Sequence, residues 1–184
     1  MIRFLDLIIS LVGLVICIPV ITIITLLCFF ETRKPIFRQV RIGKNEVPFT
    51  ILKFRTMREN TIAGPTHLVD VSSITGLGQF LRKHKLDEIP QLWNVLLGDM
   101  SLVGARPCLM SQEELITQRK IRSVFCEKPG ITGLAQLNGV DMRDPVRLAA
   151  LDQEMLSGLS IGAYLKYIMM TVFRVISVKP FARF

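Results

Sequence analysis

The sequence predicts an α+β fold that is mainly helical, with a short β-hairpin, a membrane helix at the N-terminus and amphipathic helices at the membrane interface. Three observations predict it. The residues from Leu7 to Phe30 are 24 in a row without a charge, two strand-like segments flank a glycine-containing turn, and later segments show helical spacing of apolar residues. We divide the 184 residues into a membrane helix, 1–32, and a cytosolic, membrane-associated domain, 33–184.

The apolar segment near the N-terminus accounts for the unusual composition. Half of the residues are hydrophobic and the mean hydropathy is +0.43, although 21% are charged. A helix of about 20 apolar residues can cross or enter a bilayer core. A secretory signal has an apolar core of only about 7–15 residues followed by a small-residue cleavage site. We therefore expect a retained membrane anchor rather than a signal peptide.

Pro19 lies near the middle of this segment and predicts a kink, because proline removes a backbone hydrogen bond and collides with the preceding turn. Two topologies remain open on these residues alone. The helix either crosses the membrane with a kink, or it bends at Pro19 and returns to the cytosolic face. Arg3 lies before the segment, and Arg33 and Lys34 lie after it. Because both flanks carry positive charge, the excess of Lys and Arg on cytoplasmic flanks does not decide between the two topologies.

Positive charge follows the apolar segment directly. Of a formal net charge of +8, residues 31–60 contribute eight basic residues against three acidic ones. Such a stretch binds an anionic cytoplasmic leaflet and predicts that the following domain is cytosolic. No nucleic-acid recognition motif accompanies the charge, so we expect no nucleic-acid partner. The four cysteines have neither disulfide nor zinc spacing and are expected to be reduced.

A β-hairpin is predicted from 37–42 and 49–55, joined by a turn at 43–45. Residues two apart on a strand share a face, so Lys53 and Arg55 should project together. Residues 60–76 are rich in Thr, Ser and Gly and indicate a loop.

Five later segments are assigned from their residue patterns. A helix is predicted over 86–97, ended by Gly98, with a buried stripe that includes Trp93. A capping box at 111–114 predicts a solvated helix to about residue 122, and 129–133 reads as a tight turn. A further helix is expected over about 145–156. The apolar segment 162–178 is either an interfacial helix or a core helix.

The adjacent pair Asp87 and Glu88 is the strongest candidate for chemistry. Neighbours on a helix point about 100° apart, so the two carboxylates would have different roles. By itself the pair is an ordinary set of capping residues. Cations could converge on it, and a carboxylate among cations suits phosphoryl transfer, in which it attacks phosphorus or holds Mg²⁺. The candidate cations include Lys53, Arg55, Arg82, Lys83, Lys85 and Arg106.

Three strings, 49–57, 86–107 and 128–139, resemble the bacterial sugar transferases, which are monotopic polyprenyl-phosphate phosphoglycosyl transferases. The resemblance implies that Asp87 attacks a UDP-sugar, that UMP leaves, and that polyprenyl (undecaprenyl) phosphate then takes the sugar phosphate. It also implies Glu88 as the second member of a catalytic dyad, whose role as base or metal partner stays open, and Mg²⁺ as cofactor bound at Asp87. The implied phosphate contacts are Lys53, Arg55, Arg82 and Arg106.

The resemblance further implies a membrane helix that breaks at Pro19 and re-enters the cytoplasmic face of the bacterial inner membrane. The reaction would begin assembly of O-antigen, capsule, exopolysaccharide or glycoprotein glycans. Two residues depart from the family pattern: Val140 stands where arginine is frequent, and Ala105 where proline is. A membrane scaffold without activity and an anchored phosphohydrolase remain alternatives. The sugar and the oligomeric state are left open.

Overall fold

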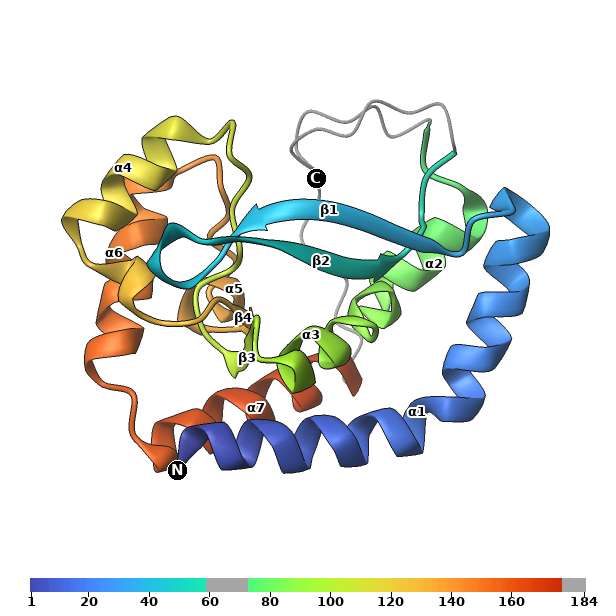
Figure 1. Ribbon diagram of the computed structural model, residues 1–184, viewed down its shortest axis with the longest axis horizontal. Coiled ribbons are helices and arrows are strands. Elements are labelled where there is room, and N and C mark those ends of the chain that lie inside the picture. The colour runs from blue at the N-terminus through green and yellow to red at the C-terminus, as the bar shows by residue number, and fades with distance from the viewer. Residues whose placement is uncertain (59–72, 177–184) are drawn as a thin grey trace.

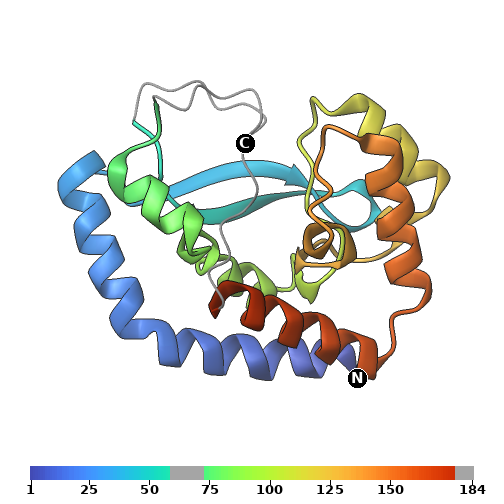
Figure 2. The same ribbon diagram turned by 180° about the vertical axis from the view of Figure 1, so that it is seen from behind.

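The computed structural model describes residues 1–58 and 73–176. A long bent helix lies along one side, and the hairpin and the shorter helices pack inside the bend (Figures 1 and 2). In chain order the elements are α1 Ile2–Thr32, β1 Ile36–Ile42, β2 Pro48–Phe54, α2 Gly76–Lys83, α3 Gln91–Leu97, β3 Ser101–Val103, α4 Glu113–Ile121, β4 Gly130–Thr132, α5 Leu134–Leu137, α6 Pro145–Ser157 and α7 Ile161–Ile176. The mainly helical fold with a short hairpin is therefore confirmed.

Helix α1 is long, apolar and exposed. Its most apolar 18-residue window has a mean hydropathy of 3.0, and only 11% of that window is buried. The helix bends part-way along its length (Figure 1), and Pro19 lies inside it without ending it. Because proline removes one helical hydrogen bond and crowds the preceding turn, it supplies a physical cause for the bend.

Both halves of α1 are bound to the rest of the protein. Near its start, Arg3 donates to the carbonyl oxygens of Val95 at 2.6 Å and of Leu96 at 2.9 Å, at the end of α3. Further along, Ile24 and Cys28 are buried in a cluster with Phe54 and Leu81, and this cluster joins α1 to β2 and α2. The helix therefore does not extend away from the domain at either end.

Asp6 fixes the first half of α1 more deeply. It is 2% exposed, and its Oδ1 accepts hydrogen bonds from the Ser101 hydroxyl at 2.9 Å, the Leu102 amide at 2.9 Å and the Tyr164 hydroxyl at 2.7 Å. A buried carboxylate needs such partners, because an unpaired charge costs several kcal/mol. Asp6 thereby ties α1 to β3 and α7, and α7 runs alongside α1 in both views (Figures 1 and 2).

The predicted hairpin is confirmed. Strands β1 and β2 pair antiparallel from Ile36 opposite Phe54 to Ile42 opposite Pro48, with a short 3₁₀ turn at Lys44–Glu46. A second sheet was not predicted: β3 pairs parallel with β4, so part of the expected tight turn at 129–133 is a strand.

Glycine explains how close these two strands come. A Cβ on Gly130 would lie 2.0 Å from the Gly104 amide nitrogen, which no side chain tolerates.

The predicted helix over 86–97 is wrong at its start. Leu86–Glu88 form a 3₁₀ turn, and α3 begins only after Pro90, which lacks the backbone donor that a continuous helix would need there. The expected end is correct, since Gly98 is left-handed with φ 96°. Trp93, expected in the buried stripe, is 51% exposed, and Asn94 and Val95 are buried instead.

Helix α4 is present, but the capping box is not formed. Gln112 precedes the helix without a side-chain cap, and its Oε1 accepts from the Leu109 amide, so the side chain points back along the chain. The helix is also less solvated than expected, because Leu115 and Arg119 are buried. Helix α6 is confirmed and is capped by Asp144, which accepts from the Arg147 amide.

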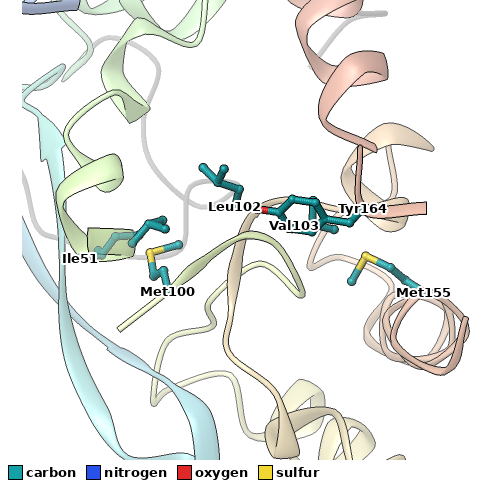
Figure 3. Packing of buried hydrophobic residues seen from close by; sticks show 7 residues of the cluster. Ile51, Met100, Leu102, Val103, Met155 and Tyr164 are labelled. Atoms are coloured by element: carbon teal, nitrogen blue, oxygen red, sulfur yellow. The ribbon is translucent and has the colours of Figure 1, made fainter. Parts of the chain in front are cut away.

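The main core joins elements from the whole length of the chain (Figure 3). Helix α7 contributes Tyr164, which is 0% exposed, while Met169 and Phe173 on the same helix are more than half exposed. The helix thus has one face in the core and an apolar face outside it, so the core reading holds for one face, and an interfacial position of the other face stays a prediction. The buried members of this core are Ile51, Val95, Met100, Leu102, Val103, Met155 and Tyr164.

Most of the predicted 60–76 loop lies outside the described residues, and only 73–76 can be placed. The cysteines at 17, 28, 108 and 126 are free thiols, as expected.

Candidate active site

The two candidate carboxylates lie in the short turn between α2 and α3. Lys85 enters the turn in a left-handed conformation with φ 58°, and Asp87 and Glu88 follow as its second and third residues. Each is 8% exposed. The position of Asp87 near the start of the predicted helix had indicated a helix N-cap. The structure shows that it is not one, because Asp87 lies inside the 3₁₀ turn. Two buried adjacent acids within one turn require compensation by cations.

Glu88 receives that compensation directly. Its Oε1 accepts from Lys53 Nζ at 3.0 Å and from Arg106 Nη2 at 2.7 Å. Burial by itself would raise the pKa of Glu88, but the charges of Arg106 and Lys53 outweigh it and hold that pKa well below its usual range. Glu88 is thus a fixed anion that orients two cations.

Asp87 is in the opposite condition. Burial, and then the negative charge of Glu88, raise its pKa, although Lys53 and Lys85 oppose the rise. Among the described residues its Oδ1 is buried and has no hydrogen-bond partner. A buried oxygen without a partner is uncommon and costs roughly 1–3 kcal/mol. That cost is understandable if the oxygen is reserved for a ligand or for reaction.

Lys53 reaches Glu88 because Asn94 fixes the edge of β2. The Asn94 side chain is 1% exposed; its Oδ1 accepts from the Leu52 amide at 3.0 Å and its Nδ2 donates to the Thr50 carbonyl at 2.8 Å. It pairs with the strand much as a third strand would, and so fixes β2 against α3. This contact holds the strand that carries Lys53 against the helix that follows the turn with the acids.

Arg106 is positioned by its own backbone. It lies just beyond β3, and Arg119 Nη1 donates to its carbonyl oxygen at 2.8 Å. Arg119 is held in turn by Asp152, at 2.6 Å, in a pair whose side chains are 1% and 0% exposed. The next carbonyl, of Pro107, accepts from Arg41 Nη1 at 3.2 Å. Two guanidinium groups, that of buried Arg119 and that of partly buried Arg41, thus hold consecutive carbonyls of this turn.

The predicted phosphate contacts separate into three groups. Lys53 and Arg106 contact Glu88, and Arg82 lies within electrostatic reach of Asp87 while its Nε donates to Thr56 Oγ1 at 2.9 Å. Arg55 is not brought to the acids. Its Nε donates to the Lys34 carbonyl, and its guanidinium lies over the Phe37 ring, 5.6 Å from the centroid.

Phe37 lies opposite Lys53 across the hairpin, and the Arg55 guanidinium lies over the Phe37 ring. Lys53 and Arg55 therefore share a face as predicted, but they contact different groups. A phosphate contact by Arg55 remains a prediction.

The two departures from the family pattern occupy apolar surroundings. Ala105 is 6% exposed, and Val140 packs partly buried against the cluster that contains Cys108 and Leu148. Val140 therefore supplies packing and not a charge to this part of the molecule.

Sequence reasoning missed four residues that shape the site: Arg41, Asn94, Arg119 and Asp152. Asn94 had a usable signal, since an amide inside an apolar helix needs partners. Arg41 was one basic residue among eight, and the pairing of Arg119 with Asp152 links two helices that no local pattern connects.

A divalent cation would find few protein ligands here. The described residues contain no group of three or more His, Cys, Asp or Glu side chains that could hold a metal. Mg²⁺ needs only one or two carboxylates when substrate phosphates and water complete its shell. Asp87, with its unpartnered buried oxygen, fits that requirement, whereas Glu88 is already bonded to two cations.

A buried acidic pair among cations, on a domain bound to a long exposed apolar helix, defines a membrane-associated enzyme site suited to phosphate chemistry. The comparisons identify the family. The chain belongs to the bacterial sugar transferases, whose family model matches residues 1–178.

Its relatives include one sugar transferase without an assigned reaction and two with a named reaction. The uncharacterized sugar transferase EpsL of Bacillus subtilis is 41% identical over 140 residues, which are 76% of this chain and 69% of the relative. The UDP-glucose:undecaprenyl-phosphate glucose-1-phosphate transferases of Klebsiella pneumoniae and Escherichia coli are 38% and 34% identical, and the matches cover 94% and 92% of this chain. The chain spans 39% of the length of each of these two.

Proposed function

We propose that the protein transfers a sugar 1-phosphate from a UDP-sugar to polyprenyl phosphate, giving a polyprenyl diphosphate sugar and UMP. The observation that carries the proposal is the inequality of the two acids. Glu88 is fixed by Lys53 and Arg106, while Asp87 Oδ1 is left without a partner among the described residues. The named reactions of the relatives support the same substrate classes.

In the proposed first step, Asp87 attacks the phosphorus that bears the sugar. The new bond joins an Asp87 oxygen to phosphorus, and the phosphorus–oxygen bond to UMP breaks, with its electron pair passing to UMP. Lys53 and Arg106, oriented by Glu88, offset the charge that develops on the phosphate oxygens. In the second step, the polyprenyl phosphate oxygen displaces Asp87 and regenerates the free enzyme.

Burial of Asp87 has a cost and a use in this scheme. It raises the pKa of the group, which leaves the carboxylate more basic and more nucleophilic when ionised. Mg²⁺ bound at Asp87 would neutralise charge on the diphosphate.

The membrane arrangement that fits best is re-entrant and monotopic. The start of α1 is held by Arg3 and Asp6, and its second half is held by Ile24 and Cys28, all against the same domain. Since the domain lies on one side of the membrane, the two attachments favour a helix that enters and leaves by the cytoplasmic face, with its bend in the bilayer. The exposed apolar side of α7 would lie in the interface beside it, next to anionic lipid.

This topology is tested by a single cysteine at position 2, in a background without the four native cysteines. In intact cells it should resist an impermeant thiol reagent added from outside and should react after lysis. Labelling before lysis would overturn the re-entrant arrangement. Pro19→Ala is the companion variant: relief of the bend should favour a straight span and increase outside labelling.

The activity is tested by incubating the full chain with a panel of UDP-sugars, Mg²⁺ and undecaprenyl phosphate, and scoring both UMP and lipid product. We expect UMP and lipid product in equal amounts with at least one sugar. Continuous UMP release that does not depend on the acceptor would indicate a phosphohydrolase, and no UMP with any sugar would indicate a scaffold.

A further inference from the structure

A small cavity of about 30 Å³ lies beside the Glu88 contacts. Three of its lining residues are cations that come from separate elements: Arg41 from β1, Lys53 from β2, and Arg106 from the turn after β3. The remaining lining residues are Ile51, Pro107, Gly130 and Met142. Three cations converging on one cavity is costly unless an anion shares it.

The protein supplies too little negative charge for these cations. Lys53 and Arg106 both bond to the same atom, Glu88 Oε1. Within the described part of the chain Arg41 bonds to neutral acceptors: its Nη1 donates to the Pro107 carbonyl at 3.2 Å and its Nη2 to Gln39 Oε1 at 2.6 Å. Its Nε is buried and, among the described residues, has no partner.

Electrostatics indicates the same shortage. Burial, and then the positive charge of Arg106, lower the pKa of Arg41 to about 10. Arginine remains charged at that value, but its environment disfavours the charge. An anion in the cavity would satisfy Nε and relieve the repulsion between the two guanidinium groups. Because Gln39 and Pro107 already fix the side chain, little rotamer entropy would be lost on binding.

Arg41 and Arg82 attend different members of the acidic pair. The charges of Glu88 and Arg106 reach Arg41, whereas the charge of Asp87 reaches Arg82. In the proposed first step the phosphate at Asp87 is the one that reacts. A diphosphate that also reaches the cavity would then have its leaving phosphate near Arg41.

We propose that Arg41 and this cavity bind the phosphate of the departing nucleoside monophosphate. The inference rests on the function proposed above and assigns Arg41 a role within it. As the bond between the two phosphates breaks, its electron pair remains on the leaving oxygen, and the Arg41 guanidinium offsets the added charge.

The first test measures binding of UMP and of glucose 1-phosphate to the full chain by calorimetry in detergent, with Mg²⁺ present. Arg41→Gln should weaken UMP binding roughly 10-fold or more, since a charge-assisted hydrogen bond is lost, and weaken glucose 1-phosphate binding much less. Arg38→Gln is the matched control: Arg38 is exposed on the same strand and lines a separate groove with Trp93, so neither affinity should change.

Unchanged UMP affinity in a folded Arg41→Gln variant overturns the proposal, as does equal weakening of both ligands. If that variant does not fold, Arg41→Lys decides: weaker UMP binding with intact glucose 1-phosphate binding supports the role, and unchanged UMP binding rejects it.

Kinetics separate this proposal from the function on which it rests. Arg41→Gln should lower kcat/KM for UMP formation roughly 10- to 100-fold. The transfer from a preformed phosphosugar enzyme to polyprenyl phosphate should be slowed much less than UMP formation, because UMP has already departed. If the wild type releases UMP and the variant does so equally well, only the Arg41 assignment fails. If the wild type releases UMP from no UDP-sugar, the proposed function fails, and the assignment with it.

Discussion

Two buried ionic clusters, one at Asp87 and Glu88 and one at Arg119 and Asp152, differ in balance and in access. Arg119 meets Asp152 one to one; its Nε and Nη2 both donate to Asp152 Oδ2, and its Nη1 to the Arg106 carbonyl. The pair is 1% and 0% exposed, so no ligand reaches it. The cluster at Glu88 has more cations than the protein neutralises, and Lys53 and Arg106 there are 18% and 34% exposed.

The comparison shows that an unpartnered oxygen is not sufficient to define a site. Asp152 Oδ1 is also buried without a partner among the described residues. It is sealed within the protein, whereas Asp87 lies beside accessible cations that a phosphate can bridge. Surplus charge together with access distinguishes the candidate catalytic cluster from the structural one.

The largest effect is expected at Asp87. Asp87→Asn keeps the size of the side chain but removes the nucleophile, so turnover should fall by at least roughly 10³-fold while the protein stays folded in the membrane. UMP release under saturating UDP-sugar measures it. A variant that retains a tenth of the wild-type rate would contradict the assignment of Asp87 as nucleophile.

Substitutions in the Arg119–Asp152 pair should first lower the free energy of unfolding. Asp152→Asn leaves Arg119 buried without a counter-charge and should cost about 3–5 kcal/mol of unfolding free energy. The double variant Arg119→Met with Asp152→Leu should recover much of that loss, because an apolar pair needs no compensation. Denaturant unfolding in detergent measures both. A double variant as unstable as the single one would show that the charges themselves are required.

Asn94 tests how α3 holds the strand that carries Lys53. Asn94→Ala leaves the Leu52 amide and the Thr50 carbonyl without their partner, which should cost about 1–3 kcal/mol. Lys53 should then be less well placed against Glu88, so activity should fall even where the protein is fully folded. Activity that follows only the folded fraction would remove Asn94 from the positioning of Lys53.

The smallest predicted effect concerns the pH dependence of stability, to which Asp87 and Glu88 contribute with opposite signs. The raised pKa of Asp87 means that stability is lost as pH rises from its ordinary value through the raised one. The lowered pKa of Glu88 means that its stabilisation is present above its ordinary value and is lost as pH falls toward the lowered one.

At pH 7, Asp87→Asn should therefore raise the thermal midpoint and Glu88→Gln should lower it. The rise for Asp87→Asn should disappear below about pH 4, where the Asp87 side chain is neutral in both states. Midpoint shifts of the same sign at pH 7 would refute the contrast.

The features that the sequence predicted correctly depend on residues close together in the chain. Three of them are confirmed: the hairpin, Gly98 at the end of α3, and the long apolar helix α1. Pro90 was a signal within reach, since a proline at that place argues against one continuous helix from Leu86. The strings that resemble the family predicted Asp87, Glu88, Lys53 and Arg106 as site residues, and in the structure Lys53 and Arg106 both contact Glu88.

What could not be predicted depends on contacts distant in sequence. The parallel pairing of β3 and β4 requires Gly104 and Gly130 to meet, and the support of Arg106 requires a helix near residue 119 to pack against one near residue 152. Neither contact produces a periodic pattern of residues in the sequence of the segments that it joins. Arg55 shows a further limit: it lies just beyond β2, and its contacts with the Lys34 carbonyl and the Phe37 ring could not be read from the strand pattern.

The central claim is that Asp87 forms a covalent bond to the sugar phosphate before the acceptor arrives. Enzyme mixed with a UDP-sugar and Mg²⁺, without polyprenyl phosphate, should release one UMP per active site. Intact-mass measurement should then show an increase equal to the sugar phosphate, and peptide mapping should locate it on Asp87. UMP release that depends strictly on acceptor, with no adduct trapped, would contradict the account and indicate direct transfer within a ternary complex.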